Sequence, residues 1–205
     1  MLSADWEQGW WSAGYRSVCG VDEVGRGALA GPLVAAAVQL GEDSASFDRL
    51  SLVADSKTLD RATRVELSII VGEVAHGIGI GLVSAAEIDE IGLGPANRLA
   101  MLRAVVALPV RPDAVLLDAM TVDLDVPQVG LIDGDARCLS IAAASIVAKV
   151  HRDRLMTELG DAHGEYGFAR HVGYGTPAHL RALSELGPCV AHRRCFAPVR
   201  RVCSP

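Results

Sequence analysis

Two adjacent carboxylates, Asp22 and Glu23, close an apolar run near the start of the chain, and a Gly25-Arg26-Gly27 turn follows them. Like charges at the edge of a core raise one another's pKa unless a cation is shared between them. The pair therefore predicts a metal site. The glycines predict a stretch of backbone that another group approaches closely.

Two further acids follow apolar runs later in the chain. Asp118 ends the run that begins at Val115, and Asp135 comes just after the run 126–132. Oxygen ligands from several strand ends suit Mg²⁺ or Mn²⁺. Two such ions about 4 Å apart can clamp the attacking and leaving oxygens of a phosphoryl displacement. Taken alone, each acid is more often a turn former or a helix cap, and the adjacent pair after a buried strand favours the metal site.

The glycine-rich turn also matches, superficially, a loop that binds dinucleotides. Two observations count against that interpretation. The acids that precede the turn would repel a pyrophosphate, and the segment after Pro32 has the pattern of a strand. A dinucleotide site needs a helix N-terminus there to hold the phosphates.

Apolar runs and turn residues predict alternating strands and helices in an α/β fold. Asp60 is expected to cap a helix, Pro95 to begin one and Gly160 to end a long one, before a loop over 161–175 and a basic tail. Glycines in the run 77–83 indicate that another element packs closely there. The prediction is a mixed central sheet flanked by helices, with a helical C-terminal segment. Strands are expected at 16–24, 33–40, 77–83, 113–118 and 126–132, and helices at 60–75, 85–91, 95–108, 139–159 and 177–186.

Length and composition limit the organisation and the partners. A chain of 205 residues predicts one domain over 16–205, preceded by a loosely ordered leader over 1–15 that its tryptophans partly dock. Five scattered cysteines, with no signal or membrane segment, predict reduced thiols in a cytoplasmic protein. The net charge of −6 argues against coating nucleic acid by bulk electrostatics, although the arginine-rich stretch 192–205 could contact a few phosphates.

Together these motifs resemble ribonuclease HII, the type 2 ribonuclease H family. The similarity covers about residues 16–200, and the set of motifs is far more specific than any one of them. The matching stretches, in chain order, are Asp22–Gly27 with Leu29–Pro32, Asp55–Lys57, Val115–Asp118, Ala143–Val150 with Arg152–Asp153, Tyr166–Phe168, His171, Gly173–Tyr174, and His192–Arg194 with Phe196 and Pro198.

The resemblance implies a ribonuclease H-like fold and an endoribonuclease that acts as a monomer. It implies cleavage of the RNA strand of RNA–DNA hybrids, and cleavage 5′ of ribonucleotides embedded in duplex DNA, which leaves 3′-hydroxyl and 5′-phosphate ends. Such cutting would serve the removal of ribonucleotides from DNA. The residues that match the metal ligands are Asp22, Glu23, Asp118 and Asp135, which would hold two Mn²⁺ or Mg²⁺ ions.

The resemblance also implies residues that recognise the substrate. The turn Gly25–Gly27 matches the reader of the ribose 2′-hydroxyl, the group that distinguishes RNA from DNA. Tyr166 matches the tyrosine that packs on the sugar after the ribonucleotide. Phosphate contacts are expected from Lys57, Lys149, Arg193 and Arg194.

Each recognition residue has a structural alternative. Arg26 could be a surface arginine, Tyr166 a core tyrosine with its hydroxyl in water, and Lys149 an exposed helix lysine. Asp153 is expected to be a structural partner on its helix. The histidines do not have the spacing of metal ligands and are assigned no catalytic role.

The chain departs from the usual pattern of the family in three places. Ala119 and Met120 follow the third acid in place of Gly and Asn, Asp133 replaces a lysine before the fourth acid, and Val172 and Gly175 replace a lysine and a proline. None of these removes an expected ligand. Two other functions remain open: a catalytically weak protein that binds RNA–DNA hybrids, and a metal-dependent nuclease or phosphatase of other specificity on the same fold.

Overall fold

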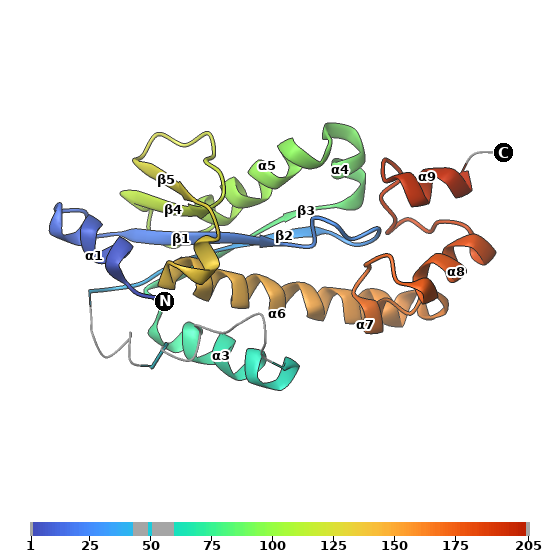
Figure 1. The fold of residues 1–205 in the computed structure, drawn as a ribbon, viewed down its shortest axis with the longest axis horizontal. Coiled ribbons are helices and arrows are strands. Elements are labelled where there is room, and N and C mark those ends of the chain that lie inside the picture. The colour runs from blue at the N-terminus through green and yellow to red at the C-terminus, as the bar shows by residue number, and fades with distance from the viewer. Residues whose placement is uncertain (1, 43–48, 51–59, 204–205) are drawn as a thin grey trace.

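The computed structural model describes residues 2–42, 49–50 and 60–203 of the chain (Figure 1). The predicted motif Asp55–Lys57 lies outside these residues. In the described part of the chain, no helix is both long and apolar enough to cross a membrane.

The predicted mixed sheet is confirmed. It has five strands in the order β3-β2-β1-β4-β5, antiparallel from β3 to β1 and parallel from β1 to β5. β1 lies at the centre because its apolar residues are covered on both faces. The strands are β1 (Val18–Val24), β2 (Leu33–Gln39), β3 (Gly77–Val83), β4 (Ala114–Asp118) and β5 (Gln128–Leu131).

Helices cover both faces of the sheet, and a smaller group of helices lies beyond one end of it (Figure 1). α5 (Leu93–Val106), with the short α4 (Ala85–Ile91), covers one face, and α6 (Leu139–Ala162) covers the other. α3 (Arg61–Val74) packs on the outer side of α6, and the side chain of Asp60 caps it by accepting from the Thr63 N–H, as predicted. Near the end of α6 lie α7 (Phe168–His171), α8 (Pro177–Leu186) and α9 (Ala197–Cys203).

Glycines and small residues allow the helices to approach the sheet closely. A Cβ at Gly20 of β1 would overlap the backbone of Ser140 and Ile141 in α6. On the opposite face, a Cβ at Gly79 or Gly81 of β3 would overlap backbone carbonyl oxygens of α5. This confirms the prediction that another element packs on these glycines.

The leader was predicted to be loosely ordered, but residues 5–12 form a helix, α1 (Asp5–Ser12). Its Trp11 is buried in the cluster formed with β1, β4 and α6. The buried Glu7 accepts a hydrogen bond of 2.7 Å from the Ser140 backbone N–H at the start of α6. The tryptophans therefore dock the leader. Glu7 adds a hydrogen bond to α6 that the sequence pattern did not indicate.

Four predicted boundaries or connections differ from the structure. Pro95 is the third residue of α5, which begins at Leu93. α6 runs through Gly160 to Ala162, because this glycine packs against Ala169 of α7 and does not end the helix. The predicted loop over 161–175 contains α7, and the basic tail contains α9.

Replacing Gly20 with alanine is expected to destabilise the protein by about 3 kcal/mol or more, because the α6 backbone must move away from β1. The matched control is Gly72→Ala in α3, where a Cβ meets nothing within 4 Å. That change is expected to stabilise by about 0.5–1 kcal/mol. Urea unfolding of both variants measures the difference. Equal effects at the two positions would contradict the close packing of α6 on β1.

Candidate active site

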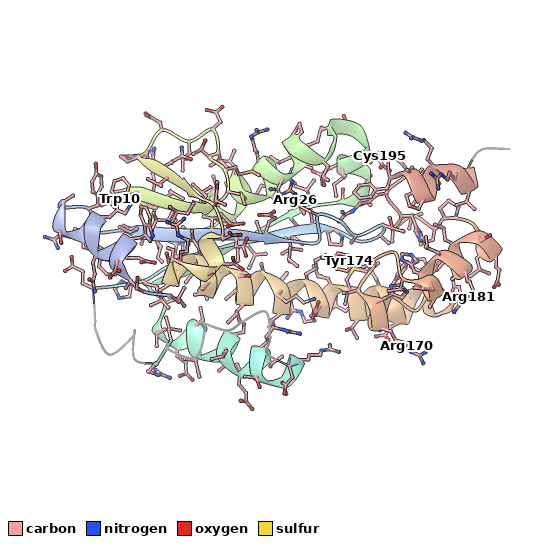
Figure 2. The ribbon with its side chains drawn as sticks, in the orientation of Figure 1. Trp10, Arg26, Arg170, Tyr174, Arg181 and Cys195 are labelled. Carbon is pink, nitrogen blue, oxygen red and sulfur yellow. The ribbon has the colours of Figure 1, made fainter. Side chains whose placement is uncertain are left out.

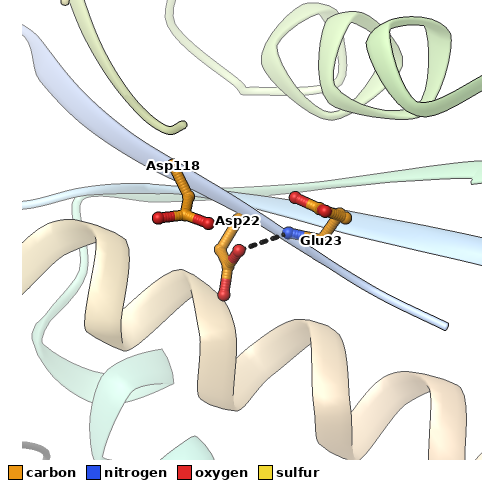
Figure 3. A group of neighbouring side chains, drawn as sticks. All are labelled: Asp22, Glu23 and Asp118. Atoms are coloured by element: carbon orange, nitrogen blue, oxygen red, sulfur yellow. Dashed lines mark hydrogen bonds between the residues drawn. The ribbon is translucent and has the colours of Figure 1, made fainter. Parts of the chain in front are cut away.

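Three carboxylates meet at the end of the parallel strand pair β1 and β4 (Figure 3). Val21 pairs with Leu117, so the next residues along the two strands, Asp22 and Asp118, emerge side by side. Glu23 follows directly on β1. One carboxylate oxygen from each acid lies within 4.8 Å of the others.

The electrostatics of this group are unfavourable without a cation. Burial and the charges of Glu23 and Asp118 raise the pKa of Asp22, and a hydrogen bond from Ser145 of α6 opposes them, so that the pKa is about 8. The Glu23 backbone N–H donates to Asp22 Oδ1 at 2.7 Å. Burial also raises the pKa of Glu23, and Arg26 opposes this from 3.5 Å.

The donor set fits a hard divalent cation. Every candidate ligand is a carboxylate oxygen, which Mg²⁺ and Mn²⁺ prefer over nitrogen or sulfur. Glu23 Oε2 is buried and has no hydrogen-bond partner among the described residues. An unpaired buried carboxylate oxygen is costly, and a cation at this position would satisfy it.

Asp135 is not part of the group of three acids. It lies in the short 3₁₀ helix Gly134–Ala136, after β5. The neighbouring Gly134 N–H donates to Asp118 Oδ1 at 2.8 Å, so this turn is tied to the third acid. The residue before Asp135 is therefore bonded to the group, and the role of Asp135 as a fourth ligand stays a prediction.

The turn Gly25–Gly27 begins two residues after the acids. Gly25 has a φ of 92°, in the left-handed region that favours glycine, and a Cβ there would overlap the Arg152 side chain. Arg26 is exposed and points toward Glu23 with its guanidinium group. The turn thus presents backbone and one cation beside the carboxylates.

Arg193 does not have the exposed position of a phosphate contact. It is fully buried, and its guanidinium group donates to Gly25 O at 2.7 Å, Arg26 O at 3.0 Å and Gly31 O at 2.9 and 3.0 Å. The carbonyls of an irregular buried turn need donors, and a guanidinium group can reach several of them at once. The prediction for Arg193 was wrong, because this side chain holds the turn in place.

Arg152 is a second buried arginine, and the sequence pattern predicted no role for it. It donates to Pro32 O at 3.0 Å, Val172 O at 2.9 Å and Ala30 O at 3.2 Å. Burial and the charge of Arg152 lower the pKa of Arg193 to about 10. Both groups are still charged at neutral pH, so two positive charges lie close to the turn.

Tyr166 is buried, and Tyr174, for which no role was predicted, is the exposed tyrosine of this region. Tyr166 is 6% exposed, stacks on Phe168 with 5.3 Å between ring centroids, and donates its hydroxyl to Gly187 O at 2.8 Å. It is a core tyrosine, although its hydroxyl is not in water. Tyr174 is 37% exposed and lies between the sheet end and the C-terminal helices (Figure 2). Its Cε1 would be 3.9 Å from a Cβ at Gly27.

Tyr174 is therefore the aromatic residue beside the turn. The guanidinium group of Arg152 lies 5.7 Å from its ring centroid. A flanking Gly173 and Gly175 mark it in the sequence, but only the folded chain shows which of two nearby tyrosines is exposed.

Two of the other predicted phosphate contacts, Lys149 and Arg194, are at least partly accessible to solvent. Lys149 is partly exposed and pairs with Asp153 at 2.7 Å, which is the helix-surface partner expected for Asp153. Arg194 is exposed, and its backbone N–H donates to Asp89 Oδ2 at 2.8 Å. Lys57 lies outside the described residues.

Comparison with known proteins decides the family. The family model for Ribonuclease HII matches residues 19–199. The chain belongs to the ribonuclease HII family. It is similar to the ribonuclease HII of Geobacillus thermodenitrificans, with 52% identity over 195 residues that cover 95% of this chain and 74% of the relative. The ribonuclease HII of Chloroflexus aggregans is 50% identical over 94% of this chain and 92% of the relative.

A solved structure agrees with this assignment. The crystal structure of ribonuclease H2 from Pyrococcus horikoshii OT3 has a TM-score of 0.79 at 27% identity, over 91% of this chain and 96% of that one. Ribonuclease HII proteins are ribonucleases H, metal-dependent hydrolases that act on RNA–DNA substrates, which confirms the predicted enzyme class.

The departures from the ribonuclease HII pattern have local consequences. Ala119, where the family usually has glycine, adopts a φ of 58° directly after Asp118. The backbone there turns so that the Ala119 N–H reaches Leu131 O at 2.8 Å. Asp133 has a φ of 53°, which aspartate tolerates better than most residues. Met120 lies against the buried Asn97, whose amide is 3.4 Å from the sulfur.

Asp22→Asn is expected to stabilise the metal-free ribonuclease HII at pH 8. The pKa of Asp22 rises from 3.8 to about 8 on folding. Between these two pH values Asp22 is therefore protonated in the folded state and ionised in the unfolded chain. The free energy of unfolding therefore falls as pH rises from about 4 to about 8. Asparagine removes this dependence and adds about 1–3 kcal/mol at pH 8.

Urea unfolding in EDTA between pH 5 and pH 8 measures this slope for the parent and the variant. Asp161→Asn, on the exposed end of α6, is the control and keeps the slope of the parent. Identical slopes for the parent and Asp22→Asn would contradict the raised pKa.

Proposed function

We propose that this ribonuclease HII cleaves the RNA strand of RNA–DNA hybrids and cuts 5′ of single ribonucleotides in duplex DNA. The products would carry 3′-hydroxyl and 5′-phosphate ends. The observation that supports this most strongly is the group Asp22, Glu23 and Asp118 beside the turn Gly25–Gly27. The three acids provide the ligands for phosphodiester hydrolysis, and the turn provides close backbone contact with a sugar.

The acids act by holding divalent cations, Mg²⁺ or Mn²⁺. Asp22, Glu23 and Asp118 would bind directly, and Asp135 would complete a second site, since Gly134 already ties its turn to Asp118. When bound, the ions supply an activated water and neutralise charge on the departing 3′-oxygen. On the buried side of the group, next to α6, hydrogen bonds from Ser145 and from the Glu23 N–H hold Asp22 in place.

The turn acts by reading the ribose 2′-hydroxyl through its backbone. The exposed Gly27 leaves space for a sugar, whereas Gly25 makes room for the Arg152 side chain. Arg193 fixes the Gly25 and Arg26 carbonyls from the buried side of the turn. A hydroxyl that both donates and accepts can pair with such backbone groups, whereas a deoxyribose cannot. DNA without a ribonucleotide would therefore leave these groups unpaired.

Tyr174 takes the role expected of Tyr166, because it is exposed beside Gly27. Its ring would pack on the sugar after the ribonucleotide. Lys57, Lys149 and Arg194 remain proposed phosphate contacts, and the buried charges of Arg152 and Arg193 would add to the attraction. We place the enzyme in the cytoplasm as a monomer that binds RNA–DNA hybrid or ribonucleotide-containing duplex.

Asp22→Asn and Asp118→Asn are each expected to lower kcat by about 10³-fold or more, because each removes a ligand that acts in the transition state. The assay uses duplex DNA with one ribonucleotide, in Mg²⁺ and in Mn²⁺, with Asp161→Asn as the control that keeps parental activity. An all-DNA duplex tests specificity. Full activity of Asp22→Asn would refute the mechanism, and equal cutting of all-DNA duplex would support a nuclease of other specificity. Binding of the hybrid by the parent without cleavage would support the catalytically weak alternative.

Tyr174→Ala is expected to raise KM for the ribonucleotide-containing duplex by about 10-fold, a typical loss for a base- or sugar-stacking ring. Tyr166→Phe removes only the bond to Gly187 O, so it is expected to lower stability by about 1 kcal/mol with KM unchanged. Steady-state kinetics and thermal unfolding of the pair measure both effects. The reverse result, with KM raised only in Tyr166→Phe, would return the substrate contact to Tyr166.

A further inference from the structure

Two buried histidines without a role in the proposed reaction form a hydrogen-bonded chain that ends at Tyr174. His179 is 0% exposed and His192 is 2% exposed. The His192 and His179 Nε2 atoms are 3.0 Å apart, and His179 Nδ1 is 2.9 Å from Tyr174 O. At the other end, the Cys189 backbone N–H donates to His192 Nδ1 at 3.0 Å.

The partners at the two ends fix the proton positions. A carbonyl only accepts, so His179 must carry its proton on Nδ1 and donate to Tyr174 O. The Cys189 N–H only donates, so His192 Nδ1 must be unprotonated. In neutral rings this leaves His192 Nε2–H as the donor and His179 Nε2 as the acceptor of the central bond. All four ring nitrogens then have a hydrogen-bond partner, and every bond donates in the same direction, from Cys189 toward Tyr174.

Both rings are kept neutral by their surroundings. Burial lowers the pKa of His179, and burial together with the neighbouring His179 lowers the pKa of His192 to about 4. A second proton on His179 Nε2 would face the His192 N–H at the central contact, and one on His192 Nδ1 would face the Cys189 N–H. Among the described residues, the group close enough to share a metal ion is Asp22, Glu23 and Asp118, so these nitrogens are not grouped as metal ligands.

The segment that contains His192 is also bonded to the turn Gly25–Gly27 and the residues that follow it. His192 pairs with Ala30 in an isolated antiparallel bridge, and the next residue, Arg193, donates its backbone N–H to Leu29 O at 2.8 Å and its side chain to Gly25 O. The Leu29 N–H in turn donates to Gly173 O at 2.8 Å. The dipeptide His192-Arg193 therefore contacts the segment of the turn directly, and it reaches the segment of Tyr174 through His179 and Leu29.

We propose that His179 and His192 are positioning residues that set the place of Tyr174 relative to the turn Gly25–Gly27. The proposal rests on the proposed function, in which Tyr174 contacts the substrate sugar. His192 holds His179 in the tautomer that donates to Tyr174 O, and Arg193 holds the turn from the same segment. An apolar residue at 192 would fill the space but leave His179 Nε2 and the Cys189 N–H without partners, so His179 could rotate away from Tyr174.

The tautomers give the most direct test, and it needs no variant. Long-range ¹H–¹⁵N correlation spectra of the parent enzyme at pH 7 report which ring nitrogen carries the proton. We expect a neutral His179 protonated on Nδ1 and a neutral His192 protonated on Nε2. Either ring in the opposite tautomer, or charged at pH 7, would overturn the proposal.

Kinetics test the positioning role. His192→Phe is expected to raise KM for duplex DNA with one ribonucleotide by about 10-fold with kcat within about twofold, since the chemistry at the acids is untouched. His192→Gln, which keeps a donor toward His179, is expected to recover most of the loss. The control is His163→Phe, the same change at a ring that lies beside Tyr166 and Phe168, which leaves KM unchanged.

A double-mutant cycle separates this proposal from the function on which it rests. In a Tyr174→Ala background, His192→Phe is expected to raise KM by less than about twofold more, because the ring it positions is absent. The same factor in both backgrounds would overturn the positioning role. Unchanged KM for Tyr174→Ala alone would instead refute the proposed substrate contact. If His192→Phe does not fold, His192→Gln and the tautomer spectra still decide the question.

Discussion

The repulsion among three carboxylates in a poorly solvated site is the constraint on which this structure depends. The parallel pairing of β1 with β4 brings Asp22 and Asp118 together, and α6 closes over Gly20 to exclude water from the same strand end. Burial then raises the pKa of Asp22 to about 8. Such a group is stable as three anions only with a cation, so the fold prepares a metal site by making the metal-free state unfavourable.

Two buried arginines, Arg152 of α6 and Arg193 of the C-terminal segment, supply the opposite charge and the rigidity that recognition requires. They lie against backbone carbonyls of the turn and of its neighbours. They stabilise irregular backbone that no regular ladder of hydrogen bonds supports. Because the turn and Tyr174 are held by the same few residues, sugar recognition is coupled to the geometry of the carboxylates only a few residues away.

The carboxylate site and the sheet could be predicted from the sequence because their signals are local. An apolar strand that ends in Asp22-Glu23, and another that ends in Asp118, place acids at one sheet edge by pairing alone. Arg193 and Tyr166 could not be assigned in the same way. Whether an arginine meets phosphate or carbonyls, and which of two tyrosines is exposed, depends on packing between α6 and the last 40 residues or so, which no periodicity in the sequence encodes. Gly160 illustrates the same limit, since its contact with Ala169 decides its role.

Crystals of the parent enzyme soaked in Mn²⁺ would show by anomalous scattering at the manganese edge whether the three acids bind the ion. We expect a peak bonded to carboxylate oxygens of Asp22, Glu23 and Asp118, and its loss in Asp118→Asn. A peak elsewhere in the molecule, or an empty group of acids at saturating Mn²⁺, would contradict it.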